Sequence, residues 1–68
     1  MMKFDDIPNS RISEIVDEYI HSQRDRGLMK DRYINGFTYE RLGEMYDLST
    51  LQVKRIVYKQ SERIAQHI

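Results

Sequence analysis

The chain has 68 residues, and its eleven basic side chains balance eleven acidic ones, so the formal net charge is zero. A chain of this length forms one small domain with little room for a substrate cleft, and the absence of cysteine excludes disulfides, thiolate metal sites and a thiol nucleophile. No stretch approaches the roughly 18 apolar residues of a membrane span or has the positively charged start of an export leader, so we expect a soluble, cytoplasmic protein.

Residues 1–9 form a polar lead-in, in which Phe4 and Ile7 are candidate anchors onto the domain. A helix is predicted from Ser10, whose hydroxyl is suited to accept a hydrogen bond from the first turn. Apolar residues then recur at spacings of three and four, which places them on one helical face. These residues are Ile12, Ile15, Val16, Tyr19 and Ile20.

A second helix is predicted to begin after Ser22, a capping residue with Asp25 three positions later. Asn35 and Gly36 are expected to end it, because both accept the left-handed backbone angles found at helix ends. Its predicted buried side chains are Leu28, Met29 and Tyr33.

The third predicted helix begins after Thr38, another capping residue, and Phe37 is placed to pack against the helix that follows it. The helical pattern stops at Asp47. The apolar residues on the predicted buried face are Leu42, Met45 and Tyr46.

A tight turn is predicted at residues 47–49. Asp47 tolerates a left-handed backbone, Leu48 is apolar and can point into the core, and Ser49 can cap the next helix. Gly43 lies inside the preceding helix, where glycine costs about 1 kcal/mol relative to alanine. We therefore expect the next helix to approach closely at this glycine.

A fourth helix is predicted from residue 50 toward the end of the chain. Its buried stripe comprises Val53, Ile56, Val57, Gln60, Ile64 and Ile68. The side chains off that stripe are Thr50, Leu51, Gln52, Lys54, Arg55, Tyr58 and Lys59. The predicted architecture is an all-α, four-helix helix-turn-helix domain over residues 10–68, with the motif at residues 38–58. The same spacing also suits a small helical bundle with no role in nucleic-acid binding.

Charge is unevenly distributed along the chain. Residues 1–20 hold two basic and five acidic side chains, whereas residues 48–68 hold four basic and one acidic. A polarity of this kind favours orientation of the C-terminal part toward phosphates. The alternative is a pair of ordinary solvated faces.

Residues 24–64 resemble region 4 of sigma-70-type bacterial transcription initiation factors. The Arg-x-Arg, apolar pair, Arg-Tyr and glycine of that family are matched by Arg24, Arg26, Leu28, Met29, Arg32, Tyr33 and Gly36. Its Thr-x-Glu-x-apolar-Gly is matched by Thr38, Glu40, Leu42 and Gly43. Val53 and Lys54 repeat a pair found in response-regulator DNA-binding domains, so the resemblance extends to the wider superfamily.

The resemblance implies that the fourth helix reads double-stranded DNA in the major groove, with no cofactor or metal. Gln52 would pair with adenine, and Arg55 or Lys54 with guanine. The base-reading residues implied are Thr50, Leu51, Gln52, Lys54 and Arg55. The phosphate contacts implied are Thr38, Tyr39, Arg41, Ser49 and Lys59. Sigma region 4 usually has charged residues in place of Thr50 and Leu51, so its target sequence is not carried over.

The expected protein is a small stand-alone regulator of the phage or mobile-element kind, because the chain has no counterpart of the other sigma regions. The alternative function is a module that binds RNA polymerase or another regulator without reading DNA. A homodimer is also expected, through the apolar first helix or the tail at Ile64 and Ile68, unless these residues close the core of one chain. An enzyme is disfavoured, because His21 and His67 are the only histidines and neither has a local metal-ligand partner.

Overall fold

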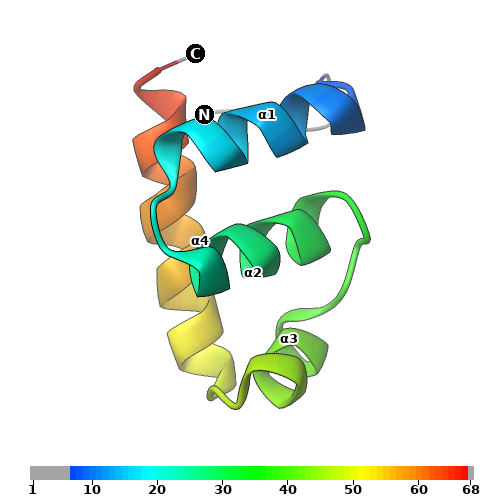
Figure 1. The fold of residues 1–68 in the computed structure, drawn as a ribbon. Helices are drawn as coiled ribbons and strands as arrows, with labels where there is room; N and C mark the ends of the chain where they lie inside the picture. Colours follow the sequence, from blue (N-terminus) through cyan, green and yellow to red (C-terminus); the bar gives the residue numbers. More distant parts are fainter. Residues whose placement is uncertain (1–6, 68) are drawn as a thin grey trace.

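Four helices make up the domain in the computed structural model, which describes residues 7–67. They are α1 (Asn9–Tyr19), α2 (Gln23–Tyr33), α3 (Tyr39–Tyr46) and α4 (Thr50–Ala65) (Figure 1). No strand occurs between residues 7 and 67, and the prediction of an all-α, four-helix class is confirmed. The positions suggested for Phe4 and Ile68 lie outside the described residues.

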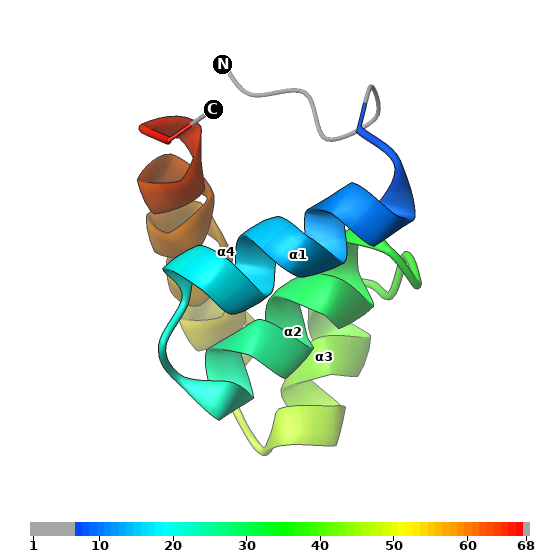
Figure 2. The same cartoon turned by 45° about the horizontal axis from the view of Figure 1, so that its top comes forward.

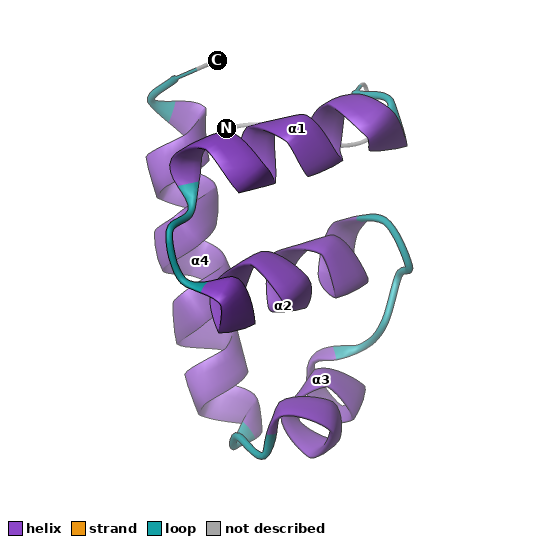
Figure 3. Cartoon of the chain, viewed as in Figure 1, coloured by secondary structure: helices purple, strands orange, loops and turns teal. Residues whose placement is uncertain are grey.

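The helices are connected by short segments of three, five and three residues (Figure 3). α4 runs along the other three helices, with α3 against its N-terminal half and α1 against its C-terminal half (Figures 1 and 2). α2 lies between α1 and α3 and contacts all the other helices. The longest helix therefore serves as the support on which the shorter ones are arranged.

The core is formed by apolar side chains from all four helices. Those that are buried are Ile12, Ile15, Val16, Ile20, Leu28, Met29, Leu42, Val53, Val57 and Ile64. The predicted stripes of the first and second helices are thus confirmed, with Tyr19 and Tyr33 half-buried at their edges. On the fourth helix Val53, Val57 and Ile64 are buried and Ile56 is half-buried. These side chains close the core of a single chain, so the surfaces expected to form a dimer at α1 and Ile64 are not available to a second copy.

Met45 is the exception among the predicted core residues, because 43% of its surface is exposed. α3 has only eight residues, and the helices that pack most closely against it are α2 and α4. Leu42 faces the core fully, and the following turn presents Tyr46 rather than Met45 toward α2. Of the three residues predicted on the buried face of this helix, Leu42 is buried, Tyr46 is half-buried and Met45 is exposed.

Three of the four predicted helix caps are present. Ser22, Thr38 and Ser49 accept hydrogen bonds through their hydroxyls from the backbone N–H three residues later, at 3.3, 3.1 and 3.1 Å. The prediction for Ser10 was wrong: α1 begins at Asn9, and the carbonyl of Pro8 accepts the first backbone bonds. The N-cap residue is Pro8, whose side chain has no hydrogen-bond acceptor, so α1 begins without a side-chain cap.

The end of α2 follows the prediction in part. Gly36 has a φ of 74°, the left-handed conformation expected there. Asn35 does not adopt a positive φ, and its side-chain amide instead donates to Asp31 at 2.8 Å.

Arg26 joins α1 to α2 in a way that the sequence did not reveal. Its guanidinium donates to the backbone carbonyls of Ile20 and of Asp17, the latter at 2.9 Å. Carbonyls at the end of a helix lack partners within it, and a cation there also complements the helix dipole. Lys30 adds an ion pair with the Asp17 carboxylate at 2.8 Å. Arg26, which the sigma resemblance includes, thus has a structural role.

A buried polar pair joins α2 to α4. The Gln60 side chain, only 5% exposed, donates from Nε2 to the carboxylate of Asp25 at 2.9 Å. Asp25 is 8% exposed and also accepts from Arg24 at 3.1 Å. The Gln60 Oε1 has no partner among the described residues. Gln60, predicted to lie on the buried stripe of the fourth helix, is therefore buried there with a hydrogen-bond partner.

Tyr46 joins α3 to α2. Its hydroxyl donates to the carboxylate of Asp31 at 2.6 Å. Burial, followed by the hydrogen bond and the negative charge of Asp31, raises the pKa of Tyr46 to about 12. A group whose pKa is higher in the folded state stabilises the fold below its unfolded pKa of about 10 and loses that effect as the pH rises to about 12.

Tyr46→Phe is therefore expected to lower the free energy of unfolding by about 1–2 kcal/mol at pH 7. Between pH 10 and 12 the wild-type protein should lose stability more steeply than the variant. Urea unfolding followed by circular dichroism at several pH values measures both effects. Tyr58→Phe, which alters an exposed tyrosine, is the control. Equal pH slopes for Tyr46→Phe and the wild type would contradict the assignment.

Candidate nucleic-acid interface

The connection between α3 and α4 is compact and closely packed. Asp47 adopts the left-handed conformation, with φ 56° and ψ 48°, as predicted. The Leu48 N–H donates to the carbonyl of Gly43 at 2.8 Å, and Leu48 packs partly buried against the core. A Cβ on Gly43 would lie 2.6 Å from the Leu48 carbonyl oxygen. The close approach expected at Gly43 exists, but the turn rather than the body of α4 makes it.

The start of α4 is held by two reciprocal hydrogen bonds. The Gln52 N–H donates to Ser49 Oγ at 3.1 Å, and the Ser49 N–H donates to Gln52 Oε1 at 2.9 Å. This capping box satisfies two donors that the first turn of a helix leaves without partners. The orientation of α4 relative to α3 is thus set by backbone contacts at the turn and by these side chains.

The predicted base-reading residues lie at the start of α4, as Thr50 to Arg55. Leu51, Gln52 and Arg55 are exposed, whereas Thr50 and Lys54 are half-buried. Leu51 is 57% exposed. α4 therefore presents a mixed surface of one long apolar side chain and several hydrogen-bond donors to solvent.

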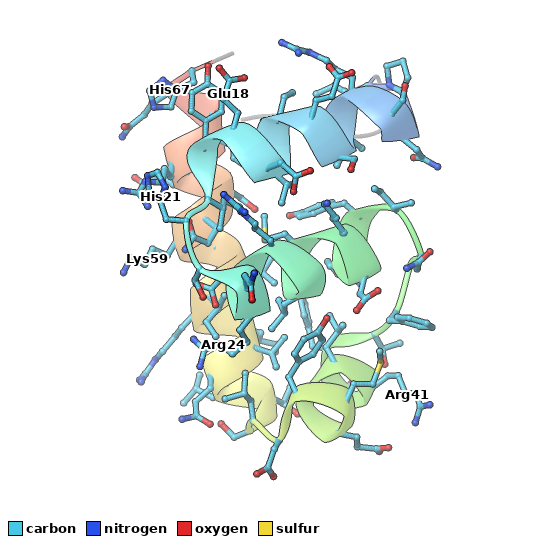
Figure 4. The ribbon with its side chains drawn as sticks, viewed as in Figure 1. Glu18, His21, Arg24, Arg41, Lys59 and His67 are labelled. Atoms are coloured by element: carbon cyan, nitrogen blue, oxygen red, sulfur yellow. The ribbon has the colours of Figure 1, made fainter. Side chains whose placement is uncertain are left out.

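The predicted phosphate contacts do not all lie together. Thr38 and Ser49 are at the N-terminal ends of α3 and α4, with their hydroxyls in caps. Arg41 forms an exposed ion pair with Glu44 at 3.3 Å. Figure 4 shows Arg41 and Lys59 on opposite edges of the molecule, so they would contact different parts of one ligand.

Tyr39 is the centre of a cluster that the sequence did not reveal in full. The Arg32 guanidinium carbon lies 4.3 Å from its ring centroid, and Lys54 Nζ lies 5.8 Å from the same centroid. Tyr58 meets the ring edge-on at 6.4 Å. Burial of Tyr39, opposed by the charge of Arg32, raises the pKa of its phenol. This half-buried ring positions two cations between α2, α3 and α4.

Arg32 was absent from the predicted site residues. It is anchored by donation to the Phe37 carbonyl at 2.9 Å, as well as by the Tyr39 ring. Its place in the sigma-like Arg-Tyr pair was the available signal. The sequence alone does not indicate that Tyr39, seven residues later, returns to the same place.

Within the part of the chain that the structure describes, the basic side chains of α4 form no ion pair with a carboxylate. Among residues 7–67, ion pairs form between Arg11 and Glu14, Arg24 and Asp25, Lys30 and Asp17, and Arg41 and Glu44. Arg55 and Lys59 are exposed and belong to none of these pairs. Figure 4 places Glu18 of α1 near the C-terminal end of α4, away from α3. The acidic part of α1 and the start of α4 are thus at opposite ends of the domain.

The histidines do not lie in a common site. His67 stacks on Tyr19 with ring centroids 4.2 Å apart, and His21 lies in the connection between α1 and α2. Within the described part of the chain, no three potential metal ligands come together, and no helix is long and apolar enough to cross a membrane.

No known protein family, curated protein or solved structure matches the chain. The arrangement of α3, the turn and α4 is therefore the basis for assigning a function.

Proposed function

We propose that this protein binds double-stranded DNA sequence-specifically and regulates transcription, with α4 as the reading helix of a sigma region 4-like helix-turn-helix. The observation that carries the proposal is the exposed basic surface of α4, on a helix held by a closely packed turn. Arg55 and Lys59 have no carboxylate partner within residues 7–67, so both charges are available to an anionic ligand.

The dimensions of α4 suit the major groove of DNA. Sixteen residues give a helix of about 24 Å, and the groove is about 12 Å wide, enough for one helix. The N-terminal half of a reading helix usually contacts base edges. In this chain that half carries Leu51, Gln52 and Arg55 on its exposed side.

Fluorescence anisotropy with labelled genomic fragments tests the proposal. We expect the affinity to fall as salt increases, because cationic side chains displace counterions from phosphates. Arg55→Ala should weaken binding to the preferred fragment by about 5- to 150-fold, the value of a good base contact. Arg11→Ala, an exposed arginine of α1 paired with Glu14, is the matched control and should bind as the wild type does. Binding that is insensitive to salt, or equal in Arg55→Ala, would refute the proposal.

A protein-interaction module is the second candidate, because two large side chains on α4 are strongly exposed. Leu51 is 57% and Tyr58 60% exposed. Tyrosine is enriched among the residues that dominate binding energy in protein interfaces, and the partner proposed for this case is RNA polymerase. The test is whether the immobilised protein retains RNA polymerase. Retention that is lost in Tyr58→Ala but kept in Arg55→Ala would favour this function.

One copy of the domain reads only a few base pairs, so a homodimer on two half-sites about 34–36 Å apart is part of the proposal. Because the apolar face of α1 is buried in the chain, the copies would associate on DNA rather than through that face. Analytical ultracentrifugation with and without a duplex containing two half-sites distinguishes these cases.

A further inference from the structure

In the side-chain amide of Gln52, the oxygen Oε1 is hydrogen-bonded within the protein and the nitrogen Nε2 is not. Its Oε1 lies 2.9 Å from the Ser49 backbone nitrogen, which can only donate, so the atom facing Ser49 is the oxygen. Its Nε2 has no partner among the described residues, and the residue is exposed. Gln52 therefore presents two N–H donors to solvent while its acceptor serves the helix cap.

The different roles of Oε1 and Nε2 limit which bases Gln52 can bind. A glutamine that pairs with adenine needs its oxygen to accept from the N6 amino group while its nitrogen donates to N7. The oxygen has a second lone pair, but to accept from adenine N6 it would have to do so in the side-chain orientation that its bond to Ser49 fixes, or leave the Ser49 N–H without its partner. When Gln52 Nε2 donates to guanine N7 and O6, or to thymine O4, Oε1 makes no contact with the base and keeps its bond to Ser49.

We infer that Gln52 selects a keto base, guanine or thymine, by donation from Nε2 alone, and that it does not form the adenine pair. The inference rests on the proposed DNA-binding function and narrows its target. Arg55, three residues along the same exposed face, also only donates. The start of α4 is therefore matched to a strand whose major-groove edge is rich in acceptors.

Two variants of Gln52 distinguish its contact with a DNA base from its role in capping α4. Gln52→Glu keeps a side-chain oxygen for the Ser49 N–H but loses the Nε2 donor, whereas Gln52→Met removes both in a side chain of similar length. Thermal unfolding reports the cap: Gln52→Glu should keep the wild-type midpoint, and Gln52→Met should lower it by a few degrees.

Selection from a randomised duplex library with the full chain identifies the preferred site, and titration of single-base variants measures each position. At one position the wild type should prefer guanine or thymine over adenine by roughly three- to tenfold, the effect of one or two hydrogen bonds. That preference should disappear in Gln52→Met. In Gln52→Glu it should reverse toward cytosine or adenine, which offer amino donors.

The outcomes are distinct. A preference for adenine that depends on Gln52, or the absence of any position that depends on it, overturns this inference while leaving DNA binding intact. A keto preference that Gln52→Glu retains also overturns it, because capping alone would then explain the effect. Failure of the wild type to select any duplex overturns the proposed function itself, and this inference with it.

Discussion

Gly43→Ala is expected to lower the free energy of unfolding by about 2–3 kcal/mol, a large part of the roughly 3–5 kcal/mol that a core of this size supplies. The added Cβ would lie 2.6 Å from the carbonyl oxygen of Leu48, which belongs to the backbone and cannot rotate away. Relief requires the turn to move, and α4 moves with it. Urea unfolding followed by circular dichroism measures the change.

Glu44→Ala is the matched control, because Glu44 is the next residue of α3 and its side chain is exposed. It should change stability by no more than about 0.5 kcal/mol. Helix propensity taken alone predicts the opposite sign for Gly43→Ala, a gain of about 1 kcal/mol. A Gly43→Ala protein as stable as the wild type would therefore show that the turn does not contact α3 as described.

Asp25→Ala should be similarly damaging, with an expected loss of about 2–3 kcal/mol. The substitution leaves Nε2 of the buried Gln60 without its acceptor, in addition to the Oε1 that already lacks a partner. Replacing both members of a buried polar pair by apolar groups is far less costly than removing one. Gln60→Met in the Asp25→Ala background should therefore restore most of the lost stability.

Thermal and urea unfolding of the two single variants and the double variant complete this cycle. Glu18→Ala, an exposed acidic residue of α1, controls for the loss of a negative charge. If Asp25→Ala costs no more than Glu18→Ala, or if Gln60→Met makes the Asp25→Ala protein less stable still, the pair does not act as described.

Local signals in the sequence predicted most of the backbone. Thr38, Ser49 and Asp47 each act through contacts within a few residues, so their capping and left-handed conformations could be read from the chain itself. The prediction for Ser10 failed because the helix begins at Asn9, with Pro8 as the N-cap, so Ser10 lies inside the first turn. Met45 failed because periodicity identifies a helical face but not how much of that face its neighbours cover.

The candidate site was less predictable, because it depends on contacts between helices. Sequence spacing placed Arg55 and Lys59 on the exposed side of α4, where the structure also has them. The bond from the Ser49 N–H to Gln52 is local, and the Ser-x-x-Gln spacing of a capping box indicates it. Sequence spacing could not show that Arg32 and Lys54 lie against the ring of Tyr39. Such pairings arise from packing and from competition between partners, which a one-dimensional pattern does not contain.

The short connections between the helices have a consequence for the kinetics of folding. Segments of three, five and three residues bring each helix next to its successor, so closing each of these connections costs little chain entropy. Helical domains dominated by such local contacts fold within microseconds to milliseconds. We expect the domain to regain its structure in that time after each unfolding event, which limits how long its apolar side chains are exposed to aggregation.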